Sequence, residues 1–290
     1  MNGIVIVDKP AGWTSQDVTA RLRSVFGTRR IGHGGTLDPM ATGVLPVFVG
    51  RATRGVEFFE HAEKAYETIL IPGITTDTQD ITGTVLSHQE VSVTEEQLEA
   101  VLPRFRGDIL QVPPMYSALK VNGQKLCDLA RKGREVPREP RPITIFELTL
   151  LGFDDGKPRL RVRCSKGTYI RTLCQDLGEA LGCGGCMGSL RRIQAGAYTL
   201  EDAVPLDTLL KAEHPEAYLR PVDSLFPQYP AVTLTPNQEK RCRNGNSFSV
   251  PLSPGTYRAY SQRGEFLMLA RVSEGTMETV KSFFEPDEKT

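Results

Sequence analysis

The chain has 290 residues, 39% of them hydrophobic, and its basic and acidic residues balance to a formal net charge of zero. No apolar stretch approaches the roughly 20 residues that cross a bilayer, which excludes a helical membrane protein. The zero charge excludes the overall basic character of many nucleic-acid-binding domains, and the length is enough for two domains.

The first predicted elements are a strand, a helix and a glycine-rich loop. Residues 3–8 form an apolar strand, and a capping box that begins at Thr14 opens a helix that ends at Gly27. The loop carries four glycines, at positions 32, 34, 35 and 43. It leads into a buried strand at 44–49, in which Pro46 favours an edge position or a bulge.

The central part alternates short strands and helices. We expect a helix at 51–62, strands at 66–71 and 82–88, and a helix after a second capping box at Thr94. Residues 108–121 are extended, and 124–132 form a basic helical segment. A hairpin joins 143–153 to 158–164 across an Asp-Asp-Gly turn.

The composition of the last third of the chain changes after residue 223. Before that point we expect a helix at 169–181, a strand at 190–200 and a helix at 205–212. Three prolines then mark a linker, and a compact segment follows with a helix near 236–243 and several short strands. Because strands and helices interleave without a regular βαβ rhythm, we expect an α+β fold with a central mixed, largely antiparallel sheet.

Basic residues gather in two stretches despite the zero net charge. Between residues 21 and 54 six arginines face Asp38 alone, and between 157 and 171 six basic residues have no acid among them. A zero sum can therefore hide a basic face for a nucleic acid, although an ordinary solvated surface would look the same.

The six cysteines and the N-terminus are typical of a reduced, cytoplasmic protein. Cys183 and Cys186 form the sole CxxC pair. Cys164 and Cys174 could complete a four-ligand zinc site, but the spacing is not that of a zinc ribbon, so we expect structural thiols and no metal. The start of the chain lacks the basic and long apolar segments of a signal peptide.

Asp38 is the first candidate for catalysis. It lies in a loop of high glycine density, where the backbone must turn sharply or approach another group, and the loop feeds a rigid strand. An aspartate before a proline is more often a simple turn former, so the residues alone leave both interpretations open.

The loop also carries a family resemblance. GGTLDPMATGVL, which contains Asp38, resembles the motif of the pseudouridine synthases that holds their essential aspartate. Five further segments match in the same order: DKPAGWTS at 8–15, KAYET at 64–68, VPPMYSALKVNG at 112–123, SKGTYIRTLCQDLG at 165–178 and GSLRRI at 188–193. Together they are similar to the bacterial tRNA pseudouridine synthase B family, which converts the T-loop uridine at tRNA position 55.

The resemblance implies a pseudouridine synthase fold in two domains. Residues 1–226 would be the catalytic domain, with an RNA-binding insert like a thumb at about 124–142. Residues 227–290 would form a small PUA-like β domain that binds RNA, a match that rests on GNSF at 245–248 and the strand pattern.

The resemblance also assigns the site. It makes Asp38 the catalytic carboxylate, Arg171 its ion-pair partner, and Tyr66 the aromatic residue against the flipped uracil. It places Tyr169, Leu190 and His33 near the base or the space that the base vacates. It places Asp80 and Lys120 near the site or the RNA, and gives Arg54 a phosphate-binding charge. From the residues alone, Tyr66 and Leu190 read as core residues and Arg171 as an ordinary helix residue. Arg54 departs from the lysine that is frequent in the family.

The implied reaction is an isomerisation that needs no cofactor. The implied partner is the T-arm of tRNA, bound without a guide RNA because stand-alone members carry the insert, and we expect a monomer and no membrane partner. A tRNA-binding or tRNA-folding chaperone without catalysis is the alternative. The joint presence of Asp38, Tyr66, Tyr169, Arg171 and Leu190 argues against that loss of catalysis.

Overall fold

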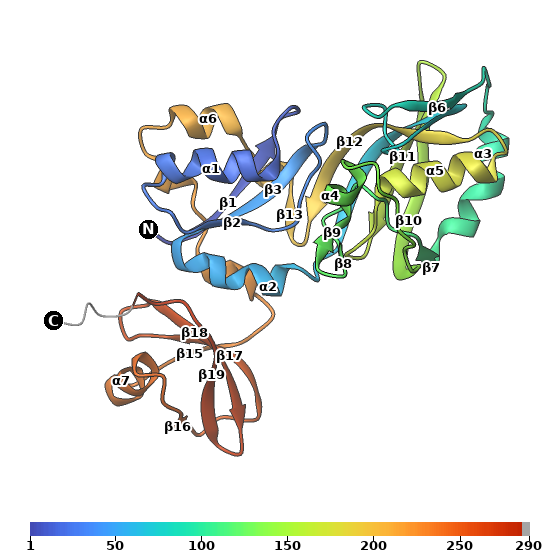
Figure 1. Ribbon diagram of the computed structural model, residues 1–290. Helices are drawn as coiled ribbons and strands as arrows, with labels where there is room; N and C mark the ends of the chain where they lie inside the picture. Colours follow the sequence, from blue (N-terminus) through green and yellow to red (C-terminus); the bar gives the residue numbers. More distant parts are fainter. Residues whose placement is uncertain (286–290) are drawn as a thin grey trace.

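The computed structural model describes residues 1–285 and contains two units (Figure 1). The larger unit is built on a ten-stranded sheet, and the smaller one, at the C-terminal end of the chain, on a five-stranded sheet. The strands of the larger sheet are β1 (Gly3–Lys9), β2 (Ile31–His33), β3 (Thr42–Val49), β4 (Lys64–Pro72), β7 (Gly107–Gln111), β10 (Arg141–Asp154), β11 (Lys157–Cys164), β12 (Gly185–Ala195), β13 (Tyr198–Thr199) and β14 (Val204–Pro205). The smaller sheet consists of β15 (Ala231–Thr233), β16 (Phe248–Ser249), β17 (Gly255–Tyr260), β18 (Phe266–Ser273) and β19 (Thr276–Ser282).

Two hairpins lie outside these sheets, and the remaining elements are short helices. The hairpins pair β5 (Ile74–Thr76) with β6 (Val85–His88), and β8 (Lys120–Val121) with β9 (Gln124–Lys125). The α-helices are α1 (Ser15–Val25), α2 (Val56–Phe59), α3 (Glu95–Val101), α4 (Leu126–Ala130), α5 (Ile170–Ala180), α6 (Leu206–Lys211) and α7 (Pro236–Arg243). The 3₁₀ helices are η1 (Gly50–Gly55), η2 (Leu102–Phe105), η3 (Leu200–Asp202), η4 (Pro215–Tyr218) and η5 (Val222–Leu225).

The larger sheet is mixed and largely antiparallel, as predicted. Its order is β14-β1-β3-β12-β4-β11-β10-β7, with β2 paired to β3 and β13 to β12. Only two pairings are parallel, β1 with β14 and β3 with β12. The strand β12 therefore lies in the middle and joins the two halves of the sheet.

The two faces of this sheet bury separate cores. On one face, α1 and α6 cover the β1–β3 half while α5 and α3 cover the β4–β10 half (Figure 1). On the other face, a second core joins β1 and β3 to α2, η5 and the smaller unit. The site lies where the two helix-covered halves meet, at the loop between β2 and β3.

The capping boxes predicted at Thr14 and Thr94 are confirmed. The Thr14 side chain accepts a hydrogen bond from the Asp17 amide, and the Asp17 carboxylate accepts one from the Thr14 amide. Thr94 and Gln97 make the same exchange. Each pair satisfies two amides that the first turn of a helix leaves free.

The expectation for Pro46 was wrong. The strand β3 lies inside the sheet, and Pro46 pairs with Ile6 of β1 without a register shift. The Pro46 carbonyl accepts a hydrogen bond from the amide of Gly34, so the nitrogen of Pro46 also faces away from β1. On that side, β2 pairs with β3 only at residues 47–49 and β12 pairs with it only at 42–43. The Pro46 nitrogen lies in the gap between these two pairings, so the missing N–H costs no hydrogen bond of the sheet.

Several predicted boundaries also move. The helix expected at 51–62 is η1 followed by α2, and the basic helix at 124–132 shrinks to α4. The strand expected at 190–200 begins at Gly185 and turns at Gly196 before β13. The proline-marked linker contains β15, and Arg141 and Pro142 belong to β10 rather than to an insert. Within residues 1–285, no helix is long and apolar enough to span a membrane.

Candidate active site

Asp38 lies in the loop of residues 34–41, which connects β2 to β3. The strands β3 and β12 pair only at Thr42 and Gly43, directly after this loop, and the loop therefore lies at the centre of the sheet. Gly43 has φ +100°, and a side chain there would overlap the backbone of Arg192. The motif glycine thus allows the close approach of two strands that places the loop beside β12.

Arg171 binds Asp38 from the first turn of α5. Its Nε lies 3.0 Å from Asp38 Oδ2, and its Nη2 lies 3.4 Å from Oδ1. The same guanidinium donates to the carbonyls of Thr78 (3.1 Å) and Tyr116 (2.9 Å). The arginine side chain is only 7% exposed while that of Asp38 is 34% exposed, so the carboxylate is held rigidly and still reaches solvent.

Asp80 supplies a second carboxylate to Arg171. Its Oδ2 lies 3.9 Å from Arg171 Nε, and its Oδ1 accepts hydrogen bonds from Thr78 and Thr82. The loop that carries it is fixed against β12 by hydrogen bonds between Ile81, Gln79 and Met187. Gln79 has φ +65°, a strained conformation for a residue with a side chain, and such strain is frequent at functional sites.

The electrostatics of Asp38 are a balance between burial and cations. Burial raises the pKa of Asp38, Arg171 and Lys9 lower it, and Asp80 raises it again. The net shift is upward. The carboxylate is therefore more basic than a free aspartate and depends on Arg171 to stay ionised.

Tyr66 and Leu190 lie on adjacent central strands. Tyr66 of β4 is 8% exposed and Leu190 of β12 is 7% exposed, and both belong to the core beneath α5. Burial raises the pKa of Tyr66, and Asp38 is close enough to raise it further. Both residues are packed as the residues alone predicted, in the same core cluster as Leu37 of the Asp38 loop.

Tyr169 occupies the N-cap position of α5, two residues before Arg171. Its amide donates to Gln111 Oε1 (2.8 Å), and its carbonyl accepts from Gln111 Nε2 (3.1 Å). Burial raises the pKa of its phenol, while the charge of Arg171 lowers it. A buried glutamine at the edge strand β7 thus holds the start of α5, and with it Arg171, in place.

His33 lies at the end of β2, just before the loop. Its Nε2 is 3.4 Å from Gln16 Nε2, and its Nδ1 is buried without a partner in the part of the chain that the structure describes. Burial and the charge of Arg192 lower the pKa of His33, so the ring is neutral near pH 7.

Lys120 and Arg54 stand apart from these residues. Lys120 is exposed on β8, and Arg54 is exposed in η1, which packs with the second core. Neither side chain forms a hydrogen bond or ion pair with the Asp38 loop among residues 1–285. The structure therefore brings together seven of the nine predicted residues: Asp38, Arg171, Asp80, Tyr66, Leu190, Tyr169 and His33.

Two buried cations next to the site had no predicted role. Lys9 is fully buried and donates to the carbonyls of Pro10, Trp13 and Pro39, the residue after Asp38. Arg192 is 1% exposed and donates to the carbonyls of Val44 and Gly35. Strand alternation could have revealed Arg192, because Leu190 and Arg192 must point to the same face while Arg191 points to the other.

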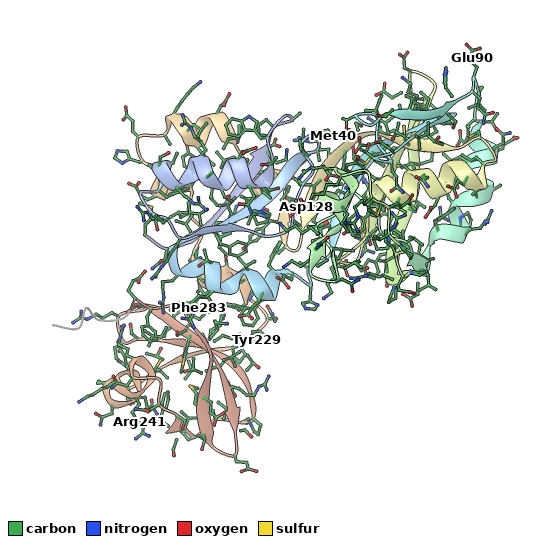
Figure 2. All side chains as sticks on the ribbon, viewed as in Figure 1. Met40, Glu90, Asp128, Tyr229, Arg241 and Phe283 are labelled. Carbon is green, nitrogen blue, oxygen red and sulfur yellow. The ribbon has the colours of Figure 1, made fainter. Side chains whose placement is uncertain are left out.

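The predicted thumb insert is part of a longer folded segment, residues 112–140, here called the thumb segment. It has its own small core of Met115, Leu126 and Leu129, packed against five neighbouring side chains. The segment reaches the site through the Tyr116 carbonyl, which accepts from Arg171. Asp128 of α4 and Met40 of the Asp38 loop both lie in the central region between the two halves of the larger unit (Figure 2).

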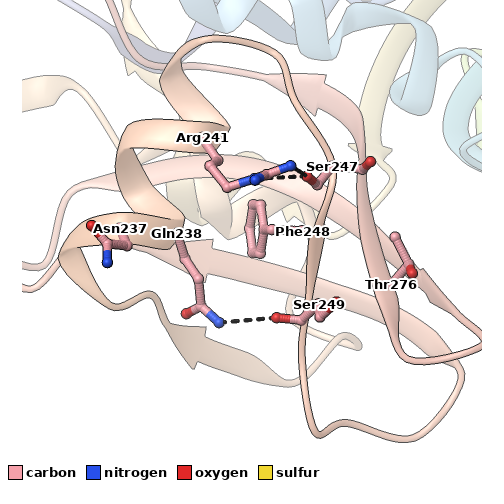
Figure 3. Close-up of a pocket in the computed structure, with 7 residues that line it drawn as sticks. All are labelled: Asn237, Gln238, Arg241, Ser247, Phe248, Ser249 and Thr276. Carbon is pink, nitrogen blue, oxygen red and sulfur yellow. Dashed lines mark hydrogen bonds between the residues drawn. The ribbon is translucent and has the colours of Figure 1, made fainter.

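The smaller unit carries a cavity of about 430 Å³ between α7 and β16 (Figure 3). Gln238 and Arg241 of α7 line it and donate to the carbonyls of Ser249 and Ser247. The exposed cation and the amide side chains give the cavity a polar character.

Sequence comparisons identify the relatives of this chain. The family model "TruB family pseudouridylate synthase (N terminal domain)" matches residues 23–170, and "tRNA pseudouridylate synthase B C-terminal domain" matches residues 171–226. A protein of Stutzerimonas stutzeri named tRNA pseudouridine synthase B is 47% identical over 94% of this chain and 92% of its own length. A protein of Dechloromonas aromatica with the same name is 46% identical over 90% of this chain and 89% of its own.

Solved structures share the fold at lower identity. The chain superposes on a chain in a crystal structure of a Cbf5-Nop10-Gar1 complex with a TM-score of 0.74 and 24% identity, over 98% of this chain and 86% of the other. It also superposes on a chain in the structure of an H/ACA RNP bound to a substrate RNA containing 2'-deoxyuridine. That match has a TM-score of 0.73 and 23% identity, again over 98% of this chain and 86% of the other. These likenesses confirm the pseudouridine synthase fold.

Proposed function

The chain belongs to the TruB family of pseudouridylate synthases, tRNA-modifying isomerases, and from that premise we propose that it converts the uridine at position 55 in the T-loop of tRNA. The observation that carries the proposal is the Asp38–Arg171 ion pair, which is assembled from distant segments beside Tyr66 and Leu190. It is the arrangement that a half-buried catalytic carboxylate requires to stay ionised.

The reaction breaks the bond between C1′ and N1, turns the uracil, and joins C1′ to C5. Two routes begin from ionised Asp38: the carboxylate attacks C1′, or it takes a proton from C2′. Arg171 keeps the carboxylate charged and aimed in both routes, and Asp80 and the carbonyl of Thr78 hold Arg171. No electrons are gained or lost overall, so we expect no redox cofactor, and we expect activity to persist in EDTA once the tRNA is folded.

The target base must leave its stack before it can react, at a cost of a few kcal/mol. Tyr66 offers an aromatic face to the extruded uracil, and stacking contributes about 1–3 kcal/mol per base. Leu190 gives an apolar contact, Tyr169 borders the Asp38–Arg171 pair, and neutral His33 fills the space that the base leaves.

The RNA would be held by exposed cations away from the Asp38–Arg171 pair. The thumb segment closes on the T-arm, Lys120 lies within it, and Arg54 contributes phosphate contacts. We assign residues 1–226 to the catalytic domain and 227–290 to a PUA-like RNA-binding domain, of which 286–290 lie outside the described residues. The cavity of the smaller unit, with Arg241, supports that assignment. The protein then acts in the cytoplasm as a monomer without a guide RNA.

The test is incubation with an unmodified tRNA transcript, followed by mapping of pseudouridine. We expect one pseudouridine, at position 55, and none in a matched transcript that carries cytidine there. Product at another position would contradict the specificity, and no product with any tRNA would contradict the enzyme assignment.

Asp38→Asn separates catalysis from a chaperone role. The change keeps the shape and removes the charge, so product should fall below detection while tRNA binding survives, because phosphate contacts supply most of the affinity. Arg171 retains two carbonyls and Asp80, so we expect a change in unfolding free energy of less than about 2 kcal/mol. A folded variant that still forms product at a near-normal rate would remove Asp38 from the mechanism.

A further inference from the structure

Arg192 of β12 is a buried cation without a carboxylate partner. It is 1% exposed and heads the largest fully buried side chains of the molecule. Within residues 1–285 its hydrogen bonds go to the carbonyls of Val44 (Nε, 2.7 Å) and Gly35 (Nη2, 3.2 Å), and no acid forms an ion pair with it. A buried charge without a counter-charge is costly, so its retention at this position calls for a cause.

The guanidinium faces Tyr66. Arg192 stands directly opposite Tyr66 in the register of β12 and β4, as Leu190 stands opposite Thr68. Burial raises the pKa of Tyr66, and the nearby charge of Arg192 counteracts part of that rise. Among the groups that titrate next to Arg192, the phenol of Tyr66 is the one whose ionisation would neutralise it.

Other groups around Arg192 cannot take that part. Lys64 lies two residues before Tyr66 on the same face of β4, is 9% exposed, and is a second cation whose pKa burial and Arg192 lower to about 8. His33 is held neutral by burial and by Arg192. Neither group supplies a negative charge next to Arg192, and the positive charge of Lys64 favours an anion at the Tyr66 oxygen.

The same guanidinium also fixes the catalytic loop. Gly35 has φ +84°, and a Cβ there would lie 3.3 Å from Arg192 Nη1 and 3.8 Å from Lys64 Cε. The glycine lets the carbonyl of the loop descend onto the guanidinium. One planar group therefore sets the position of the Asp38 loop, β3 and the Tyr66 phenol together, which the single ammonium of a lysine could do only in part.

We infer that Arg192 is a positioning residue for the proton-transfer step: it holds Tyr66 and stabilises its phenolate, so that Tyr66 takes the proton from C5 after C1′ has joined C5. The inference rests on the proposed function. The C5–H bond breaks, its electron pair restores the C5–C6 double bond, and the proton moves to the phenolate oxygen. N1, which left C1′ with its bonding pair, takes a proton from water, and Tyr66 returns its proton to water, so uridine and pseudouridine balance.

The test measures single-turnover formation of pseudouridine on T-arm RNA with hydrogen or deuterium at C5 of the target uridine. Arg192→Gln should slow the reaction by about 100-fold, the scale of a lost proton-transfer catalyst. The RNA concentration at half-maximal rate should stay within about threefold, and the C5 isotope effect should rise because proton removal becomes limiting. Arg192→Lys should recover part of the rate.

Arg191→Gln is the matched control. Arg191 is the preceding residue on the opposite face of β12 and pairs with Asp8 at a partly exposed site, so its loss should leave rate and isotope effect unchanged. In a Tyr66→Phe background, Arg192→Gln should cost less than about threefold more, because coupled residues are not additive. Full additivity, or an unchanged isotope effect in a folded Arg192→Gln protein, would overturn the inference.

A second measurement applies if Arg192→Gln does not fold. Tyr66 is replaced by a fluorinated tyrosine, which lowers the pKa of the phenol and leaves Arg192 in place. The single-turnover rate should then begin to rise at a lower pH than in the wild type. An unchanged dependence of the rate on pH would overturn the inference. Absence of product from the wild-type protein would instead contradict the proposed function, so the two failures can be told apart.

Discussion

At the scale of single residues, Arg171 determines the geometry of the site. Its guanidinium contacts two carboxylates and two carbonyls that come from three segments of the chain. An arginine in the first turn of a helix meets an unfavourable dipole, and these contacts offset it. The residue therefore sets both the position and the charge of Asp38.

The pH dependence of the reaction follows from this pair. Burial already raises the pKa of Asp38, and Arg171 is the main group that lowers it. In Arg171→Met the pKa should rise further, so ionised Asp38 is lost at neutral and acidic pH. We expect the single-turnover rate at pH 6.5 to fall at least about tenfold relative to the rate at pH 9.

Arg171→Lys is the control for that prediction. It keeps the positive charge and loses the forked geometry, so its overall rate should fall while the shape of the pH profile stays closer to that of the wild type. An Arg171→Met profile that parallels the wild-type profile would show that Asp38 does not depend on Arg171 for its ionisation.

At the scale of elements, α5 contains a charge that burial disfavours. Burial, and then Glu179, raise the pKa of Asp176 from 3.8 to about 6. Between these values the folded protein binds more protons than the unfolded chain, so this residue makes stability fall as the pH rises from about 4 to 6. Above pH 6 the penalty is fully present.

Asp176→Asn should therefore stabilise the protein at high pH alone. At pH 8 we expect a gain in unfolding free energy of about 1 kcal/mol, after allowance for partial exposure, and near pH 3.8 almost none. Chemical denaturation at the two values measures it, with the exposed Asp154→Asn as control. An equal gain at both pH values would contradict the role of ionisation.

The thumb segment is the element with the clearest unpaired charge. Arg131 and Arg138 pair with Asp128 and Glu135, whereas Lys125, Lys132 and Arg134 form no ion pair among the described residues. Reversal of these three to glutamate should weaken tRNA binding and reduce the slope of log affinity against log salt by about 2. The melting temperature should change little because all three are exposed.

The matched control reverses three exposed cations on other elements, Arg104, Lys157 and Lys211. It makes the same change in net charge, so a purely global electrostatic effect would weaken binding equally. Equal affinity losses in the two triple variants would mean that the thumb segment makes no local contact with the RNA.

At the scale of the whole molecule, an aromatic cluster joins the two units. Phe226 lies against Phe266 and Phe283 of the smaller unit, with ring centroids 6.1 and 5.9 Å apart, and against Phe58 of α2. Tyr229 and Phe283 mark this junction in Figure 2. Glu57 and Lys281 add an ion pair beside it. The core is continuous across the junction, which favours a fixed orientation of the two units.

Phe283→Ala should uncouple the units. Truncation of a phenylalanine that is 3% exposed costs about 3–5 kcal/mol, and here the loss falls on the junction. Calorimetry should show the smaller unit melting ahead of the larger one. Val280→Ala, at an exposed position on β19, is the control, and a single unshifted transition in Phe283→Ala would disprove the coupling.

The sequence by itself determined the local structure and pointed to the candidate site residues. The capping boxes at Thr14 and Thr94, the hairpin of β10 and β11, and the limits of α1 and α5 follow from signals within a few residues, because hydrogen bonds at helix ends and turns are local. The motif around Asp38 was readable for the same reason, since its glycines and its aspartate are contiguous.

Only the tertiary structure decided which partners these groups have. Pro46 became tolerable inside the sheet because β2 and β12 leave a gap beside it, and Asp80 joined Arg171 because its loop docks on β12. Arg192 and Lys9 are ordinary cations in the sequence, and the register of the central strands buries them where they bind carbonyls of the Asp38 loop. Register and burial depend on contacts between residues far apart in the chain, which no local pattern specifies.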